Sequence, residues 1–189
     1  MLYIYFGRKI RVNILLPLLL FLRFYSGASV LPAVVAVIIH EAGHFIAGAA
    51  LGFKAEVVTL SPLGADIRYA GVIPYKTDVL AAFAGPLLSV VSAFAFRFIS
   101  HEYFAVSLIY GVLNFLPVPC FDGDRIARGI VYGGFPYAFA DVICSVINTV
   151  FLILLYLFSV FLLLCTSFNA SLLLICAYIF VKSYMQMGK

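Results

Sequence analysis

The chain has 189 residues, of which 65% are hydrophobic and 11% are charged, and its mean hydropathy is +1.15. A soluble domain averages about 45–50% hydrophobic and about 25% charged residues. No charged residue occurs between Asp141 and Lys182, and the net charge of +4 comes from only 12 lysines and arginines spread along the chain. This composition excludes a soluble enzyme, a disordered chain, a disulfide scaffold and a nucleic-acid-binding protein. It predicts a protein whose solvent is the lipid bilayer.

Six apolar segments approach the length of about 20 residues that a membrane-spanning helix needs. They cover residues 12–25, 30–51, 79–99, 103–119, 138–164 and 170–187. Segments that cross lipid must be helical, because lipid offers the backbone no hydrogen-bond partners. The turn between the last two is placed at 165–169, with 148–149 as the alternative. We therefore predict an all-α polytopic membrane protein with about six transmembrane helices, forming a single domain over residues 1–189.

The N-terminal segment allows two interpretations. Basic residues precede a short apolar run, and small residues follow it at 26–29, which is typical of a secretory signal. Arg23 closes the run and more apolar segments follow at once, which favours a first membrane span instead. With six spans and a cytoplasmic N-terminus, all basic residues except Arg23 and Arg97 face the cytoplasm. The positive-inside rule thus predicts that both termini are cytoplasmic.

Three ionisable residues stand together in the second apolar segment: His40, Glu41 and His44. Two histidines four residues apart share one face of a helix, where they can bind one zinc ion. The adjacent glutamate can take a proton from water, as in the His-Glu-x-x-His motif of metalloproteases. His40 is ten residues into its segment, about 15 Å along a helix and near the bilayer midplane. The alternative is that these side chains only pair with each other inside a helix bundle.

A catalytic zinc ion takes three protein ligands, so a third ligand is expected at similar depth. His101 lies in a predicted outer loop, too far from the midplane. Pro117 and Pro119 interrupt the fourth apolar segment, and Asn114 and Asp122 place polar groups on either side of the break. Broken backbone at membrane depth is tolerated only where it faces protein or a wet cavity. A carboxylate just past this break can therefore reach the same metal.

Taken together, these motifs resemble the site-2 protease family of intramembrane zinc metalloproteases, peptidase family M50. The layout of six spans with the metal-binding helix second is most similar to the short bacterial branch that includes sporulation proteases. The resemblance covers about residues 30–130, which would form the catalytic core. The residues that carry it are His40, Glu41, His44, Ala84, Gly85, Pro86, Asn114, Pro117, Asp122 and Gly123.

The resemblance implies a ligand set and a mechanism. In that family two histidines and the motif aspartate hold one zinc ion, which matches His40, His44 and Asp122 here. The zinc ion lowers the pKa of its bound water towards about 7. The glutamate that matches Glu41 is the general base. We expect Asn114 to stabilise the oxyanion or to position the substrate.

A second carboxylate competes for the role of third ligand. The chain has Asp124 where the family usually has glycine. We assign Asp122 as the ligand because it keeps the family spacing of eight residues from Asn114. Asp124 is expected to pair with Arg125 or Arg128 as an ordinary interfacial charge.

Residues 55–73 do not have a helical pattern. β-Branched residues flank a Ser61-Pro62-x-Gly64 turn, which predicts a small β-hairpin near the active site, with a plain connecting loop as the alternative. In the family a short sheet there is thought to receive the unwound substrate. An edge strand can hold an extended chain by main-chain pairing.

The resemblance implies an endopeptidase of a bacterial cell membrane that cleaves membrane-embedded or membrane-tethered regulatory proteins. Its partners would be a transmembrane protein substrate and an inhibitory membrane protein. Cys120 stands where proline is common in the family, and Ser89 stands where asparagine often occurs. Asp124 and Cys120 leave open a catalytically inactive member that acts as a scaffold. A metal transporter is a third alternative, although no polar path through the spans is visible.

Overall fold

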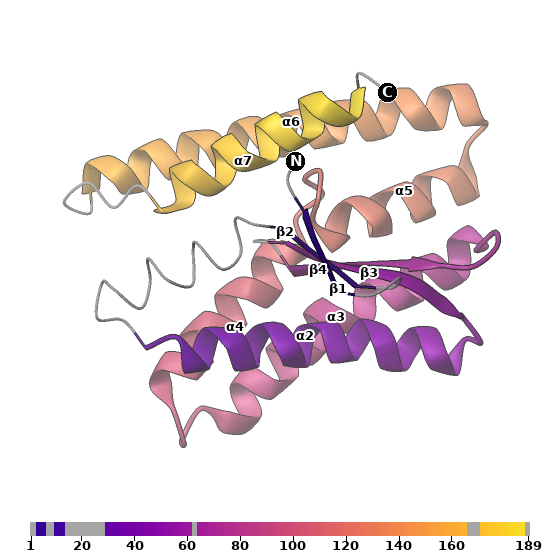
Figure 1. Ribbon diagram of the computed structural model, residues 1–189. Helices are drawn as coiled ribbons and strands as arrows, with labels where there is room; N and C mark the ends of the chain where they lie inside the picture. Colours follow the sequence, from indigo (N-terminus) through magenta and orange to yellow (C-terminus); the bar gives the residue numbers. More distant parts are fainter. Residues whose placement is uncertain (1–2, 7–9, 14–28, 62–63, 166–170, 188–189) are drawn as a thin grey trace.

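Six helices and four strands make up the part of the chain that the computed structural model describes, which is residues 3–6, 10–13, 29–61, 64–165 and 171–187 (Figure 1). The helices are α2 (Leu31–Ala50), α3 (Tyr75–Phe96), α4 (His101–Asn114), α5 (Asp122–Gly134), α6 (Tyr137–Cys165) and α7 (Ser171–Met187). The strands are β1 (Tyr3–Phe6), β2 (Ile10–Asn13), β3 (Ala55–Ser61) and β4 (Gly64–Tyr69). The predicted fold class, mostly helical with a small β element, is confirmed.

Three of these helices, α2, α3 and α6, are long and apolar enough to cross a membrane. Helix α7 adds a shorter apolar stretch, Leu172–Val181. Large apolar side chains such as Phe94 and Phe158 are exposed on α3 and α6. Apolar surface of this extent is stable when lipid covers it and is costly in water. Length, composition and exposure together indicate a membrane protein.

The observed elements differ from the predicted segments at both ends of the chain. Helix α6 runs unbroken through 148–149, so the alternative turn at that position is wrong. Its end at Cys165 agrees with a turn in 165–169, whose residues after 165 lie outside the described part. The first predicted span, 12–25, and its interpretation as a signal lie mostly outside the described residues. The strand β2 occupies residues 10–13 instead.

The fourth apolar segment ends earlier than its hydropathy suggests. Helix α4 stops at Asn114, because Pro117 and Pro119 cannot continue the helical hydrogen-bond ladder. A short irregular segment then leads into α5, a helix that the hydropathy pattern does not indicate. Asp122 and Asp124 occupy the first turn of α5, where carboxylates interact favourably with the helix dipole. The predicted break therefore places Asp122 at a helix start.

The predicted hairpin is present as β3 and β4, which pair antiparallel. It is part of a larger sheet of order β1-β2-β3-β4, in which β2 pairs parallel with β3 and β1 pairs antiparallel with β2. The two N-terminal strands were not expected. The sheet lies beside α2, and β4 forms one of its edges (Figure 1).

Helix α3 is the centre of the bundle and packs against α2, α4 and α5. Its buried positions are small, which allows close approach of neighbouring helices. They are Ala81, Ala82, Gly85, Pro86, Ser89, Ser92 and Ala93. Helix α3 approaches α2 closely at Gly43, where an added Cβ would lie 2.6 Å from the carbonyl oxygen of Ala84.

A second apolar core attaches α6 and α7 to the rest of the molecule. Five buried residues form it, two from the segment before α5 and three from the last two helices. They are Val118, Phe121, Leu155, Cys176 and Ile179. The α6–α7 pair therefore packs on the segment that leads into Asp122, rather than directly on α2 (Figure 1).

Candidate metal centre

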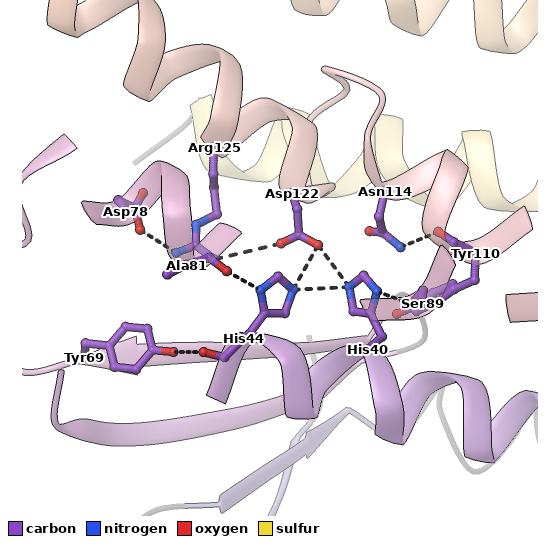
Figure 2. Close-up of polar contacts among 10 residues, drawn as sticks. All are labelled: His40, His44, Tyr69, Asp78, Ala81, Ser89, Tyr110, Asn114, Asp122 and Arg125. Atoms are coloured by element: carbon purple, nitrogen blue, oxygen red, sulfur yellow. Dashed lines mark hydrogen bonds and ion pairs between the residues drawn. The ribbon is translucent and has the colours of Figure 1, made fainter. Parts of the chain in front are cut away.

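Three side chains that the sequence predicts as metal ligands converge in the structure. His40 and His44 project from one face of α2 and are only 2% and 5% exposed, and their Nε2 atoms lie 3.2 Å apart. Oδ2 of Asp122 lies 3.0 Å from Nε2 of His40 and 3.1 Å from Nε2 of His44 (Figure 2). The three ligand atoms face one another across a space that suits a single metal ion.

Helix α3 fixes the orientation of both imidazoles through their other nitrogens. Nδ1 of His44 lies 2.8 Å from the carbonyl oxygen of Ala81, and Nδ1 of His40 lies 2.9 Å from the hydroxyl of Ser89 (Figure 2). A carbonyl can only accept, so His44 must donate from Nδ1. Its Nε2 lone pair is then directed at the cluster. Partners of this kind set the tautomer and angle of metal-binding histidines.

Two glycines make room for this arrangement. A Cβ on Gly85 would lie 2.2 Å from Nε2 of His44, so any larger residue would displace the imidazole. A Cβ on Gly123 would lie 2.3 Å from the carbonyl oxygens of Phe115 and Leu116, so this glycine lets the start of α5 pack on the preceding segment. Both glycines belong to motifs that carry the family resemblance.

The other two predicted site residues lie beside the cluster. Glu41 follows His40 directly on α2 and is partly exposed. Asn114 is buried at the end of α4, and its Nδ2 donates to the carbonyl oxygen of Tyr110 over 2.9 Å. The ring of Tyr110 packs edge-on against His40, with centroids 4.7 Å apart. The structure thus brings Asn114 next to the ligand group without making it a ligand.

Two ion pairs organise the carboxylates around the site. Asp124 accepts from Nε of Arg128 over 2.8 Å, so the expected pairing of Asp124 holds for Arg128 and not for Arg125. Asp124 is not an ordinary interfacial charge, because it also accepts from the buried Asn148 of α6. Arg125 instead donates to Asp78 on α3, and its Nη1 lies 3.9 Å from Oδ1 of Asp122 (Figure 2). The i,i+4 spacing of the first pair was a usable sequence signal. The contact between Asp78 and Arg125, which are 47 residues apart, had no such signal in the sequence.

The sheet reaches the metal helix through Tyr69 at the end of β4. Its hydroxyl donates to the carbonyl oxygen of His44 over 3.4 Å. Partial burial raises the pKa of Tyr69; Arg125 opposes this shift, whereas Asp78 and Glu41 add to it. The tyrosine therefore stays neutral and keeps its donor. The edge strand is in this way held close to the cluster.

The chemistry of this donor set can be tested against candidate metals. Two neutral imidazoles and one carboxylate are a ligand set of catalytic zinc sites, which keep a fourth position for water or substrate. Hard cations such as magnesium prefer oxygen ligands throughout. Within the described residues this is the one group of three or more histidine, cysteine or acidic side chains arranged to hold a metal ion. The residues present fit zinc.

Comparison with known proteins finds similarity to a zinc metalloprotease. No family model matches the chain. It is 25% identical over 160 residues to the zinc metalloprotease MJ0392 of Methanocaldococcus jannaschii, an alignment that covers 77% of this chain and 45% of that protein. The chain thus spans less than half the length of this relative.

Among solved structures, the site-2 protease from Methanocaldococcus jannaschii superimposes with a TM-score of 0.69 at 22% sequence identity. The match covers 95% of this chain and 92% of that structure. A fold match over nearly all of both chains includes the helices that carry the histidines and the aspartate. The chain therefore has the site-2 protease fold, and the resemblance to that family that its motifs indicate is confirmed.

Proposed function

We propose that the protein is a zinc-dependent endopeptidase that cleaves membrane-embedded or membrane-tethered regulatory proteins within the bilayer. The observation that carries this proposal is the convergence of the buried His40 and His44 of α2 with the partly buried Asp122 of α5; Glu41 adjoins His40. Helix α2 is itself apolar and long enough to span a membrane, so the cluster would lie at membrane depth, enclosed by the neighbouring helices. Similarity to a zinc metalloprotease supports the same reaction class.

The three ligands would hold one zinc ion per chain. When bound, zinc polarises the scissile carbonyl and acidifies water at its open position. Ser89 and Ala81 hold the two imidazoles in place from behind, so the ligands need little rearrangement to bind. Arg125 attracts the outer oxygen of Asp122, which leaves Oδ2 directed at the histidines.

Proton transfer in this proposal belongs to Glu41. Its carboxylate takes a proton from the attacking water and gives it to the leaving amine nitrogen. Asn114 already donates one N–H of its amide to Tyr110, and its second N–H is the donor that we assign to the substrate carbonyl oxygen. Such a donor acts on the charge that develops in the transition state.

Substrate binding is assigned to β4, the edge strand next to the cluster. A helical substrate has its backbone groups paired internally, so it must be extended before a peptide bond is accessible. An edge strand offers unpaired main-chain groups that can hold an extended chain. Tyr69 ties the end of β4 to the carbonyl of His44, which supports delivery of the substrate beside the histidines.

The orientation in the membrane is part of the proposal. Both termini are assigned to the cytoplasm of a bacterial cell because this puts nearly all lysines and arginines on the inner side. Fusions that carry an enzyme active only in the cytoplasm, placed after Lys189, test this. Activity supports the assignment, and activity only of a periplasmic reporter overturns it.

The proposal is tested by measuring zinc per chain in purified detergent-solubilised protein. We expect about one zinc ion in the wild type, the same in Asp124→Ala, and loss or clear weakening in Asp122→Ala. Asp124→Ala is the matched control because it removes a carboxylate two residues away on the same helix. A folded wild type without zinc would overturn the proposal and favour a catalytically inactive scaffold.

A further inference from the structure

A second site lies away from the metal cluster, in a cavity of about 980 Å³ between α5, α6 and α7. Asp124, Arg128 and Asn148 form a polar region in its wall, and the rest is mostly apolar side chains of the last two helices. None of the three candidate metal ligands lines it. Its volume is within the range of volumes found for ligand-binding pockets.

The polar region is a connected hydrogen-bond network that contains unused acceptor atoms. Oδ1 of Asp124 accepts from Nε of Arg128 and from Nδ2 of Asn148, both over 2.8 Å. Asn148 is only 6% exposed, and its Oδ1 has no hydrogen-bond partner in the described part of the chain. A buried amide oxygen without a partner is costly. A donor from outside would satisfy it, and Oδ2 of Asp124 is a second acceptor beside it.

The depth of Asn148 restricts what can supply this donor. It is the twelfth of the 29 residues of α6, about 16 Å from the start of the helix and about 26 Å from its end. This position falls in the hydrocarbon region for a spanning helix. Lipid head groups stay at the interface, whereas a side chain on another membrane-spanning segment reaches this depth.

We propose that the cavity is a docking site for a membrane-spanning segment of another protein that carries a hydrogen-bond donor near its middle. The lining residues on α6 extend from Ser145 to Tyr156, about 16 Å or three helical turns. Asp124 and Arg128 neutralise each other, so the network favours a neutral donor over an ion. Polar side chains between helices in lipid are a common source of specific pairing.

The site does not depend on proteolytic activity, so it can be tested independently of the proposed function. Two peptides of about 22 residues, rich in leucine and alanine with lysines at both ends, differ only in a central asparagine or leucine. Each is diluted in vesicles until it is monomeric. Binding to the full-length protein, labelled at its C-terminus, is then measured by energy transfer. We expect the asparagine peptide to bind about tenfold more tightly.

Neighbouring residues of α6 provide a matched pair of blocking variants. Ile153 lines the cavity and Leu154 does not, and their exposures are nearly equal at 53% and 54%. Ile153→Trp fills the cavity and should abolish binding of the asparagine peptide. Leu154→Trp should leave it unchanged. Asn148→Leu should remove the difference between the peptides, and thermal unfolding shows whether that variant folds.

Three results would overturn the docking site. Equal binding of both peptides would mean that the cavity binds any apolar chain, including lipid, without recognising the donor. An asparagine preference that survives in Ile153→Trp would place the peptide elsewhere on the protein. Equal losses in Ile153→Trp and Leu154→Trp would point to a general perturbation of α6. Each of these can occur in a protein that binds zinc normally, so they are separate from failure of the proposed function.

Discussion

The hydroxyl of Ser89 lies 2.9 Å from Nδ1 of His40, so a residue of α3 orients a histidine of α2 from behind. The contact is fully buried and joins positions 49 residues apart. Ser89 is also one of the positions where the chain departs from the motifs of the family that it resembles. The short side chain of Ser89 can reach the ring because α2 and α3 approach closely at Gly43.

Loss of this hydroxyl should weaken metal binding. We predict that Ser89→Ala lowers zinc affinity about 10–100-fold, because the His40 ring loses the partner that fixes its angle and tautomer. Competition with a chromophoric chelator measures this. Ser92→Ala is the control, because Ser92 is a buried serine about one turn further along α3 that bonds Tyr103 instead. Equal affinity of Ser89→Ala and wild type would show that packing alone orients the ring.

Replacement of the proposed base should separate binding from catalysis. Glu41→Gln keeps the shape of the side chain and removes its ability to take a proton. We predict that it retains zinc and loses cleavage of a membrane substrate by about 10²-fold or more. Glu56→Gln, on the exposed face of β3, should cleave normally. Wild-type turnover in Glu41→Gln would mean that another group accepts the proton.

The tight contact at Gly85 predicts an effect of a single methyl group. Gly85→Ala would place a Cβ 2.2 Å from Nε2 of His44, so the imidazole must move out of its ligand position. We predict zinc loss despite normal helical content by circular dichroism. Gly133→Ala adds the same methyl group to α5, where it meets nothing within 4 Å, and should leave zinc binding intact. Full zinc occupancy in Gly85→Ala would refute the packing described for α3.

Backbone strain before α5 predicts a stabilising substitution. Cys120 has φ of 79°, in the left-handed region that favours glycine. Cys120→Gly should raise the thermal unfolding temperature, since relief of about 1–2 kcal/mol outweighs the flexibility that glycine adds to the unfolded chain. Cys120→Pro should lower it, because proline is fixed near −65°. Stabilisation by proline, the common family residue, would contradict this backbone conformation.

Much of the site was predictable because its signals are local. The spacing of His40 and His44 places both on one helical face, and proline placement predicts the break before Asp122. The hairpin is evident from β-branched residues around a Ser-Pro turn. In each case a few consecutive residues determine the local geometry, so no knowledge of the remaining chain is needed.

The missed features depend on contacts between distant parts of the chain. Strands β2 and β3 pair although the whole of α2 lies between them in the sequence, and nothing in residues 10–13 specifies a parallel partner. The pairs Arg125–Asp78 and Asn148–Asp124 each join two different helices. The separation of their residues in the sequence therefore shows none of the i,i+3 or i,i+4 spacings that indicate a contact within one helix. Helix α5 was missed because its balanced polar and apolar residues do not resemble a span.

The distance in sequence between the ligands has a consequence for the cohesion of the protein. His44 and Asp122 are 78 residues apart, so an ion held by both closes a large loop, as a cross-link does. In a chain-entropy treatment a cross-link of this span is worth up to about 4.5 kcal/mol. Since α6 and α7 are attached largely through α5 and the segment before it, an ion bound between α2 and α5 would also anchor the C-terminal third of the chain.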